Sequence, residues 1–237
     1  MADLNLQKRT VGVNFYADLA EVKIWAPQAK SVTLLLVKNN EKYLLKEASF
    51  GYWELQTHDL KPGDLYHFIL DGEKELPDPA SVSQPDGVHS ASQALNLQFD
   101  WTDESWQNIN LAAYIFYEIH TGTFTSEGTF EAIEQKLDYL KELGITAIEL
   151  MPVAQFPSER NWGYDGVFPF AVQNSYGGPK ALQQLVNLCH KKSIAVVLDV
   201  VYNHFGPEGN YFAEFGPYFT PKYKTPWGEA VNFDDEY

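Results

Sequence analysis

One carboxylate interrupts an apolar run in the second half of the chain. Asp199 lies within residues 194–202, where most other side chains are Val, Ile, Leu or Ala. Burying an unpaired carboxylate in such a strand is costly, so Asp199 must accept hydrogen bonds or form an ion pair. Two interpretations stay open: a structural carboxylate satisfied by a neighbouring strand or loop, or a functional group at a site.

Aromatic residues stand beside glycines in the preceding loop, residues 160–166. Trp162 and Tyr164 flank Gly163, and glycine lets the backbone approach other groups closely. The two rings could form a platform for a sugar, because such side chains combine an apolar body with a polar tip. They could equally anchor a packed loop.

Two further polar residues are candidates: one follows an apolar run and the other lies within one. His204 follows the run that contains Asp199, and it could donate a hydrogen bond to a substrate hydroxyl or be an ordinary surface or core histidine. Glu149 interrupts another run, and for it we favour a structural role. No Cys/His cluster has zinc spacing, and neither a Gly-rich phosphate loop nor a Gly-x-Ser-x-Gly elbow occurs. We predict no metal and no cofactor.

Composition limits the partners. The chain has 17 Lys and Arg against 32 Asp and Glu, a net charge of −15, which disfavours nucleic acid and anionic membranes. A neutral sugar meets no such penalty, and the 15% aromatic content fits sugar binding or an aromatic-rich β core. Cys189 is the single cysteine, so no intramolecular disulfide can form. Because we find neither a signal-peptide pattern nor a spanning apolar run, we expect a cytoplasmic location.

The elements that must position these residues fall into two unlike halves. Residues 11–97 contain short alternating runs separated by turn residues, which predicts a small β-sandwich. Residues 100–112 read as a polar linker. The remaining pattern predicts β-α-β-α-β, and sites in β/α folds lie where the parallel strands end. The predicted strands are 113–120, 146–151 and 194–202, the helices are 129–143 and one opening at Pro179, and residues 205–237 read as a long loop.

Several motifs in this pattern resemble a known family. Residues 199–204 and 144–152 are similar to strand signatures of the α-amylase superfamily. Within it, residues 117–129, 161–166 and 202–211 together resemble the malto-oligosyltrehalose trehalohydrolase family. Residues 77–81 and 84–89 resemble the N-terminal domain of that family. Glycogen branching and debranching enzymes share the layout, although branching enzymes usually differ at the third strand.

The resemblance implies a mixed β and α/β fold. An immunoglobulin-like β-sandwich of the carbohydrate-binding type would occupy residues 1–99, followed by the linker at 100–112. Residues 113–237 would form the first three βα units of a truncated (β/α)8 barrel. Tyr164 would pack against the sugar before the scissile bond, His204 would bind its hydroxyls, and Asp199 would organise the strand ends. Asn203 matches a calcium ligand of some α-amylases. The predicted substrate-binding residues are Trp162, Tyr164, Asp199, Asn203 and His204.

The implied activity is hydrolysis of the α-1,4 bond next to the trehalose end of malto-oligosyltrehalose, which releases trehalose. In that family the catalytic carboxylates lie on the fourth, fifth and seventh barrel strands. The nucleophile and the acid/base are therefore expected beyond Tyr237, so no residue here is predicted to be catalytic and the chain alone is expected to be inactive.

The incomplete barrel also bears on stability. We expect residues 113–237 alone to be poorly stable, because an unclosed sheet leaves exposed edges, and the β-domain to fold independently. A companion chain could supply the missing strands. The open alternatives are a non-catalytic α-glucan-binding fragment, the N-terminal part of a branching or debranching enzyme, and a fragment without function.

Overall fold

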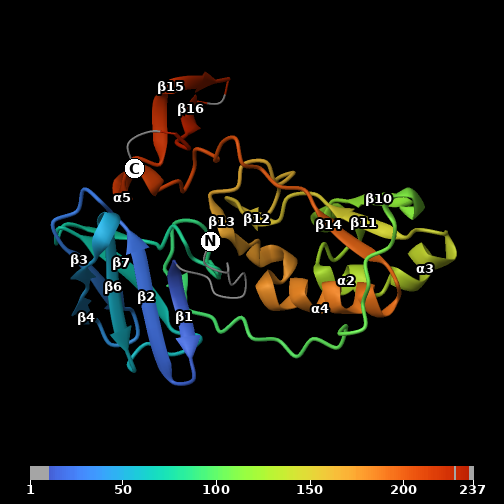
Figure 1. Ribbon diagram of the computed structural model, residues 1–237, viewed down its shortest axis with the longest axis horizontal. Helices are drawn as coiled ribbons and strands as arrows, with labels where there is room; N and C mark the ends of the chain where they lie inside the picture. Colours follow the sequence, from blue (N-terminus) through green and yellow to red (C-terminus); the bar gives the residue numbers. More distant parts are fainter. Residues whose placement is uncertain (1–10, 227, 235–237) are drawn as a thin grey trace.

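The computed structural model describes residues 11–226 and 228–234. Residues 1–10 of the predicted β-domain, and residues 227 and 235–237 of the predicted second domain, lie outside the described residues. Figure 1 shows a β-rich half and an α/β half joined along the bottom of the view by an extended segment, with the β15–β16 hairpin projecting above. None of the described helices is long and apolar enough to cross a membrane.

Tyr237, beyond which the catalytic carboxylates are expected, is one of the residues outside the described ranges. The structure therefore leaves the expected position of those carboxylates untested, and it stays a prediction. The structure describes the predicted barrel as far as residue 234.

The first half confirms the predicted β-sandwich. One sheet has the strand order β1-β2-β6-β5, and the other has β4-β3-β7-β8 with β9 also paired to β7. The strands are β1 (Gly12–Tyr16), β2 (Leu19–Trp25), β3 (Val32–Leu36), β4 (Glu41–Leu44), β5 (Lys46–Glu47), β6 (Tyr52–Thr57), β7 (Leu65–Leu70), β8 (Lys74–Leu76) and β9 (Ser92–Gln93).

Alternating side chains build the core of the sandwich. In β2, Ala20, Val22 and Ile24 are fully buried, while the residues between them are partly exposed. This period of two is what a strand with one inward face requires. Leu34 and Phe68 of the facing sheet belong to the same core cluster, so the two sheets pack face to face.

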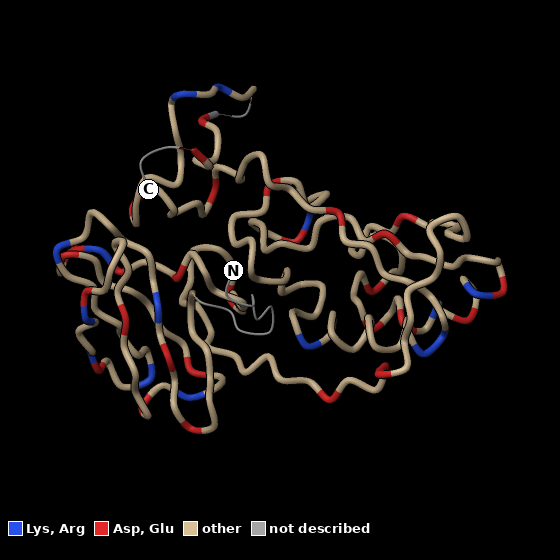
Figure 2. The backbone as a smooth tube through the Cα atoms, in the orientation of Figure 1, with Lys and Arg blue, Asp and Glu red and all other residues tan. Residues whose placement is uncertain are grey.

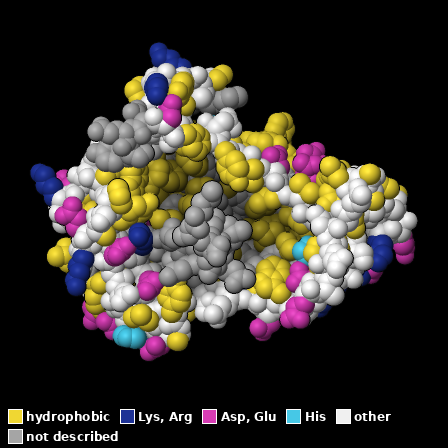
Figure 3. All heavy atoms as spheres, in the orientation of Figure 1, with side chains coloured by type: hydrophobic (Ala, Val, Ile, Leu, Met, Phe, Trp, Pro, Cys, Tyr) yellow, Lys and Arg dark blue, Asp and Glu magenta, His cyan; other side chains and the backbone are white. Residues whose placement is uncertain are grey.

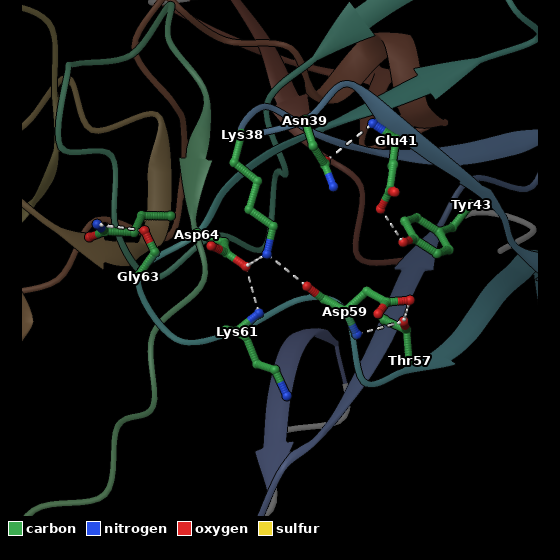
Figure 4. A network of polar contacts seen from close by, with 10 residues as sticks. Lys38, Asn39, Glu41, Tyr43, Thr57, Asp59, Lys61, Gly63 and Asp64 are labelled. Carbon is green, nitrogen blue, oxygen red and sulfur yellow. Dashed lines mark hydrogen bonds and ion pairs between the residues drawn. The ribbon is translucent and has the colours of Figure 1, made fainter.

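A polar network fixes the turns at one end of the sandwich (Figure 4). The Nζ of Lys38 donates to the Asp59 carbonyl at 2.9 Å and to Oδ2 of Asp64 at 2.7 Å. The same carboxylate oxygen accepts from the backbone N–H of Lys61 at 2.7 Å. These contacts tie the turn after β3 to the loop before β7, but partial exposure keeps the ion pair's contribution small.

The second half contains a three-stranded parallel sheet in the order β10-β11-β14, as the β-α-β-α-β pattern predicts. In Figure 1 its helices α2 and α4 lie together below the sheet. Its elements are β10 (Phe116–Ile119), α1 (Thr121–Phe124), α2 (Phe130–Glu134), α3 (Leu137–Glu142), β11 (Ala147–Leu150), β12 (Ala154–Gln155), β13 (Phe168–Val172), α4 (Gly178–Lys191), β14 (Ala195–Leu198), α5 (Phe212–Phe215), β15 (Phe219–Thr225) and β16 (Gly228–Val231), with short 3-10 turns at Ser49–Gly51, Leu111–Ala113 and Asn174–Tyr176.

The predicted helix at 129–143 is divided into α2 and α3. The N–H of Lys136 donates to the carbonyl of Ile133, three residues back, and this tighter turn interrupts the α-helical hydrogen bonding. The capping predictions are confirmed: Thr129 Oγ1 accepts from the Ala132 N–H at 3.3 Å, and Gly144 has a φ of +90° just past the last turn. The predicted apolar face also packs as one core, through Phe130, Ile133, Leu137 and Leu140.

Two other expectations were wrong. The third strand was predicted to be buried on both faces, but Leu198 at the end of β14 is 44% exposed and Val200, two residues further on, is 43% exposed. Residues 205–237 were predicted to be a loop, but they contain α5 and the β15–β16 hairpin. Of the pairs that suggested a loop, Gly206-Pro207 precedes α5, Gly216-Pro217 lies between α5 and β15, and Pro226 directly follows β15. Pro221 lies where the pairing register of the hairpin shifts, between Thr220 and Lys224.

The two halves interlock. Phe215 of α5 is 1% exposed and belongs to the core of the β-sandwich. A Cβ at Gly216 would lie 3.0 Å from Pro27 and 3.1 Å from the Trp25 ring. The β-sandwich therefore takes a core residue from far outside residues 1–99, and its independent folding stays a prediction.

The predicted linker also packs on the second half. His190 of α4 contacts the carboxylate of Asp103 at 2.5 Å, and its ring stacks on Trp106 with centroids 4.5 Å apart. The backbone N–H of Thr102 donates to Oδ1 of Asn187 on the same helix at 3.0 Å. Residues 102–106 are therefore held against α4 rather than being free of contacts.

Candidate functional site

The parallel sheet sets the frame of the site. Glu118 on β10 pairs with Glu149 on β11, and Glu149 pairs with Val197 on β14. Neighbouring residues such as Ile119 and Ile148 pack against the helices, so the alternation of side chains along a strand places the two glutamates on the opposite face. The face of the sheet away from the helices thus carries two adjacent carboxylates close to the ends of β10 and β11.

Tyr164 and Asp199 meet at the end of the third strand. Asp199 directly follows β14, where its backbone N–H donates to the Leu150 carbonyl at 2.9 Å. The Tyr164 hydroxyl donates to Oδ2 of Asp199 at 2.8 Å. This contact identifies the partner that the sequence required for the Asp199 carboxylate.

The electrostatics of this pair follow from its surroundings. The hydrogen bond to Asp199 raises the pKa of Tyr164, and partial burial together with the negative charges of Asp199, Glu118 and Glu149 raises it further. The phenol therefore stays protonated and remains a donor at neutral pH. Tyr164 is 37% exposed, so part of the side chain can contact a ligand while the hydroxyl is held in place.

Glycine makes the approach of this loop possible. Gly163 has a φ of +97°, and a Cβ there would lie 2.1 Å from the carbonyl oxygen of Pro152. Asn161 constrains the loop through two hydrogen bonds of 2.7 Å each. Its Oδ1 accepts from the Gly163 N–H, and its Nδ2 donates to Oδ2 of Asp165. The backbone between Asn161 and Asp165 is therefore tightly constrained around Tyr164.

Sequence reasoning did not select His120, which supports this loop from the end of β10. Its Nε2 lies 2.7 Å from the carbonyl oxygen of Asn161 and 3.2 Å from the hydroxyl of the buried Tyr176. A carbonyl only accepts, so Nε2 carries the proton and Nδ1 accepts from the Thr123 hydroxyl at 3.0 Å. Its position at a strand end was the one signal that could have identified it.

The other predicted residues lie on the same loops but outside the Tyr164–Asp199 contact. Trp162 is 74% exposed, and among the residues described it makes no ring contact with Tyr164. Asn203 is exposed, and its Nδ2 lies 2.9 Å from Nδ1 of His204. An amide nitrogen only donates, which places the His204 proton on Nε2.

A mostly apolar cavity of about 230 Å³ lies beside Asp199. It extends from the glycines of the 160–166 loop to the exposed end of β14 and includes Pro152, Gly163, Leu198, Val200 and Tyr202 in its lining. Within residues 11–226 and 228–234, no group of three or more His, Cys, Asp or Glu side chains is arranged to hold a metal ion. The arrangement can bind an uncharged ligand through a ring face, a fixed phenol and nearby carboxylates.

Comparisons with known proteins agree with this reading of the fold. Residues 82–227 match the alpha amylase catalytic domain, and residues 10–84 match carbohydrate-binding module 48, the isoamylase N-terminal domain. The structure of a protein assigned as an alpha amylase from Salmonella typhimurium superposes with a TM-score of 0.90 at 38% identity, over 94% of this chain and 38% of that one.

Curated relatives include malto-oligosyltrehalose trehalohydrolases. The one from Saccharolobus solfataricus is 51% identical over 95% of this chain and 40% of its own length. A 1,4-alpha-glucan branching enzyme from Fusobacterium nucleatum is 32% identical over 90% of this chain and 39% of its own length. The chain thus spans about two fifths of these relatives. With the catalytic-domain match covering more than half of its residues, the chain belongs to the α-amylase family.

Proposed function

We propose that this chain is the N-terminal part of an α-glucan hydrolase that cleaves the α-1,4 bond next to the trehalose end of malto-oligosyltrehalose. The products are trehalose and a shortened malto-oligosaccharide. The observation that carries the proposal is the contact between Tyr164 and Asp199 at the strand ends. The 51% identity to a trehalohydrolase supports this substrate over other α-glucans.

The proposed roles follow from the geometry. The half-exposed ring of Tyr164 packs against a glucose ring, and its bond to Asp199 fixes the orientation before the substrate arrives, which reduces the ordering cost of binding. Trp162 supplies a second aromatic surface from the same loop. Nε2 of His204 donates to a sugar hydroxyl, and Asn203 sets the tautomer that allows this.

We propose that cleavage needs barrel strands beyond the three described, with the nucleophile and the acid/base on residues after Tyr237. Retaining hydrolysis uses two carboxyl groups about 5–5.5 Å apart on either side of the bond. We assign neither the nucleophile nor the acid/base role to Asp199, Glu118 or Glu149. We expect the 237-residue chain alone to release no trehalose. In support, β10 and β14 each pair with one neighbour among the described strands. The further strands come from a longer polypeptide or from a companion chain.

The proposed domains are residues 1–99, a linker at 100–112 and residues 113–237. The cytoplasm is the proposed location, supported by a single, buried, unpaired cysteine, Cys189. The match to an isoamylase-type carbohydrate-binding module supports an α-glucan-contacting role for the first of these domains.

The test is trehalose release from malto-oligosyltrehalose, followed by chromatography. A protein containing this chain with the remaining barrel strands is expected to release trehalose, and Tyr164→Ala should reduce kcat/KM at least about tenfold. A product with new α-1,6 branches and no trehalose would instead favour the branching activity suggested by the 32% identical relative. Trehalose release by the 237-residue chain alone would show that the proposed inactivity is wrong.

A further inference from the structure

The motif at residues 84–89 forms a turn between β8 and β9 of the β-sandwich, and the proposed function gives it no role. We call it the sandwich turn. The N–H of Gly87, whose φ is +87°, donates to the Gln84 carbonyl at 3.2 Å. The N–H of Ser90 donates to the Gly87 carbonyl at 3.3 Å, and its hydroxyl donates to the carbonyl of Asp86 at 3.0 Å. These bonds fix the shape of the turn.

The sandwich turn packs against the second half of the chain. Val88 is 3% exposed and shares an apolar cluster with Phe168 and Ala171 of β13. The Nδ2 of Asn174, which follows β13, donates to the Pro85 carbonyl at 2.8 Å. Figure 3 shows hydrophobic side chains of both halves around the hollow between them. An apolar and a polar contact therefore hold the sandwich turn in place from outside the sandwich.

The sandwich turn also touches the loop between β14 and α5, residues 199–211, which we call the bridge loop. This loop carries Asn203 and His204. A Cβ at Gly209, whose φ is +75°, would lie 2.4 Å from Cγ2 of Val88. The backbone comes this close because glycine has no Cβ. The sandwich turn therefore limits where the bridge loop can lie.

Two side chains of the bridge loop contact His89. Its Nδ1 lies 2.7 Å from the hydroxyl oxygen of Tyr211, and its Nε2 lies 3.5 Å from Oε1 of Glu208. A carboxylate only accepts, so Nε2 carries the proton and Nδ1 of the neutral ring accepts from the Tyr211 hydroxyl. Among the described residues, Figure 2 shows acidic and basic groups scattered over both halves, so the contact depends on particular side chains rather than on two large patches of opposite charge.

On its other side, the bridge loop is fixed to the loop that carries Tyr164. The N–H of Gly206 donates to the Gly166 carbonyl at 3.1 Å, and a Cβ at Gly206 would lie 2.3 Å from the carbonyl oxygen of Asp165. The Nδ2 of Asn210 donates to the Gly206 carbonyl at 3.2 Å, which ties together the part of the loop between its two contacts. The bridge loop thus connects the sandwich turn to the loop of Tyr164.

We propose that the sandwich turn positions the strand-end site, the group formed by Tyr164, Asp199 and His204, and that His89 is its positioning residue. Without the ring of His89, the Tyr211 hydroxyl loses this contact, and the bridge loop moves more freely at its sandwich end. A site whose loops are fixed before the sugar arrives binds it at a lower ordering cost. The effect on sugar binding rests on the proposed function, whereas the effect on the ligand-free site does not.

The experiment compares NMR signals of labelled histidine and tyrosine rings in the ligand-free 237-residue chain. His89→Ala is expected to shift or broaden the signals of His204 and Tyr164. Tyr211→Phe, which removes only the hydroxyl, should change the same signals in the same direction. The double variant should change them no more than His89→Ala does, because both substitutions break the same contact.

The matched control is His58→Ala, because the two histidines are similarly exposed. The His58 side chain is 64% exposed, against 58% for His89, and its Nδ1 lies 3.2 Å from a carboxylate oxygen of Asp18 within the sandwich. This variant should leave the His204 and Tyr164 signals in place. Since both histidines are exposed, neither replacement is expected to unfold the chain.

A maltoheptaose titration of the same proteins measures the consequence for binding. His89→Ala should raise Kd about twofold to tenfold, the range for one hydrogen bond. His89→Asn places an amide near the position of Nδ1 and should restore part of the loss.

The outcomes separate the positioning role from the proposed substrate. His204 and Tyr164 signals that match the wild type in His89→Ala would overturn the positioning role, as would equal changes in His58→Ala. An unchanged Kd for His89→Ala, with a wild type that binds, would overturn it too. If the signals move as expected but the wild type binds no maltoheptaose, the positioning role stands and the proposed substrate class fails.

Discussion

The hydroxyl of Tyr164 donates a 2.8 Å hydrogen bond to Oδ2 of Asp199. This bond joins the loop after the second parallel strand to the end of the third strand. It gives the carboxylate a partner and gives the aromatic ring a fixed orientation. The position of the site thus depends on how two loops approach each other, and the predictions below test that dependence.

The first prediction concerns the titration of Tyr164. Asp199→Asn removes the charged acceptor, so the raised pKa of Tyr164 should fall toward the ordinary value of about 10. NMR of ring-labelled tyrosines would follow this titration. The signal of Tyr176, whose pKa burial raises to about 12, is the internal control and should not move.

The same shift has a consequence for stability. Because the folded-state pKa of Tyr164 lies above the unfolded value, its contribution is complete below about pH 10 and is lost as the pH rises through the folded pKa. Above about pH 6, the difference in unfolding free energy between wild type and Asp199→Asn should therefore shrink only as the pH rises past about 10. A difference that disappears between about pH 6 and about pH 8 would contradict this explanation.

The second prediction separates two costs of replacing a glycine by alanine: the collision of the new Cβ with its neighbours and the strain of a positive φ. Gly163→Ala should destabilise the chain by more than Gly144→Ala, because only at position 163 would the new Cβ collide with a backbone oxygen. Both glycines have positive φ, so each substitution carries the roughly 1–2 kcal/mol penalty of a left-handed residue. Denaturant unfolding measures both variants. Equal losses would mean that the Pro152 contact relaxes without cost.

The position of Asp199 at a strand end was predictable because a short, nearly continuous apolar run is typical of a strand in a parallel sheet. An apolar run containing one carboxylate, followed by Asn203 and His204, placed Asp199 at the correct edge. The sequence left open whether that carboxylate was structural, since the partner lies 35 residues away. His120 ends the first predicted strand but was not chosen as a site residue for the same reason: its role depends on a contact with the backbone carbonyl of Asn161, which the sequence pattern does not indicate.

The third prediction tests the coupling of the two halves. Phe215→Ala should cost about 3–5 kcal/mol, the range for removing a buried phenylalanine ring, and should lower the melting temperature of the β-sandwich itself. Phe233→Ala, at an exposed position, should change stability by less than about 0.5 kcal/mol. Calorimetry should show one transition for the whole chain. Two transitions, with the sandwich unaffected by Phe215→Ala, would instead show that the β-sandwich folds independently.

That coupling was not visible in the sequence. Residues 205–237 are rich in Gly and Pro, and such residues punctuate loops, hairpins and tight approaches alike. The approach of Gly216 to Pro27 and Trp25 depends on tertiary packing that local patterns do not encode. Likewise, the apolar run that contains β14 predicted burial on both faces, but the elements that pack above and below a sheet decide how much of each face is covered, and Leu198 stays exposed.

The fourth prediction concerns the single cysteine. Burial raises the pKa of the Cys189 thiol to about 12, so little thiolate exists at about pH 8. Alkylation of the native chain should be at least about a hundredfold slower than in denaturant. Lys191→Cys adds an exposed thiol on the same helix and should react at once with one equivalent. Rapid reaction of Cys189 in the native chain would show that α4 opens readily.

The central claim is that α-glucan contacts the ring of Tyr164 beside Asp199, and ring-labelled NMR during a maltoheptaose titration tests it most directly. We expect the Tyr164 signal to shift and saturate with ligand, and Asp199→Ala to weaken this response while the Tyr139 signal stays constant in both proteins. Saturating binding that leaves the Tyr164 signal unmoved would contradict the claim.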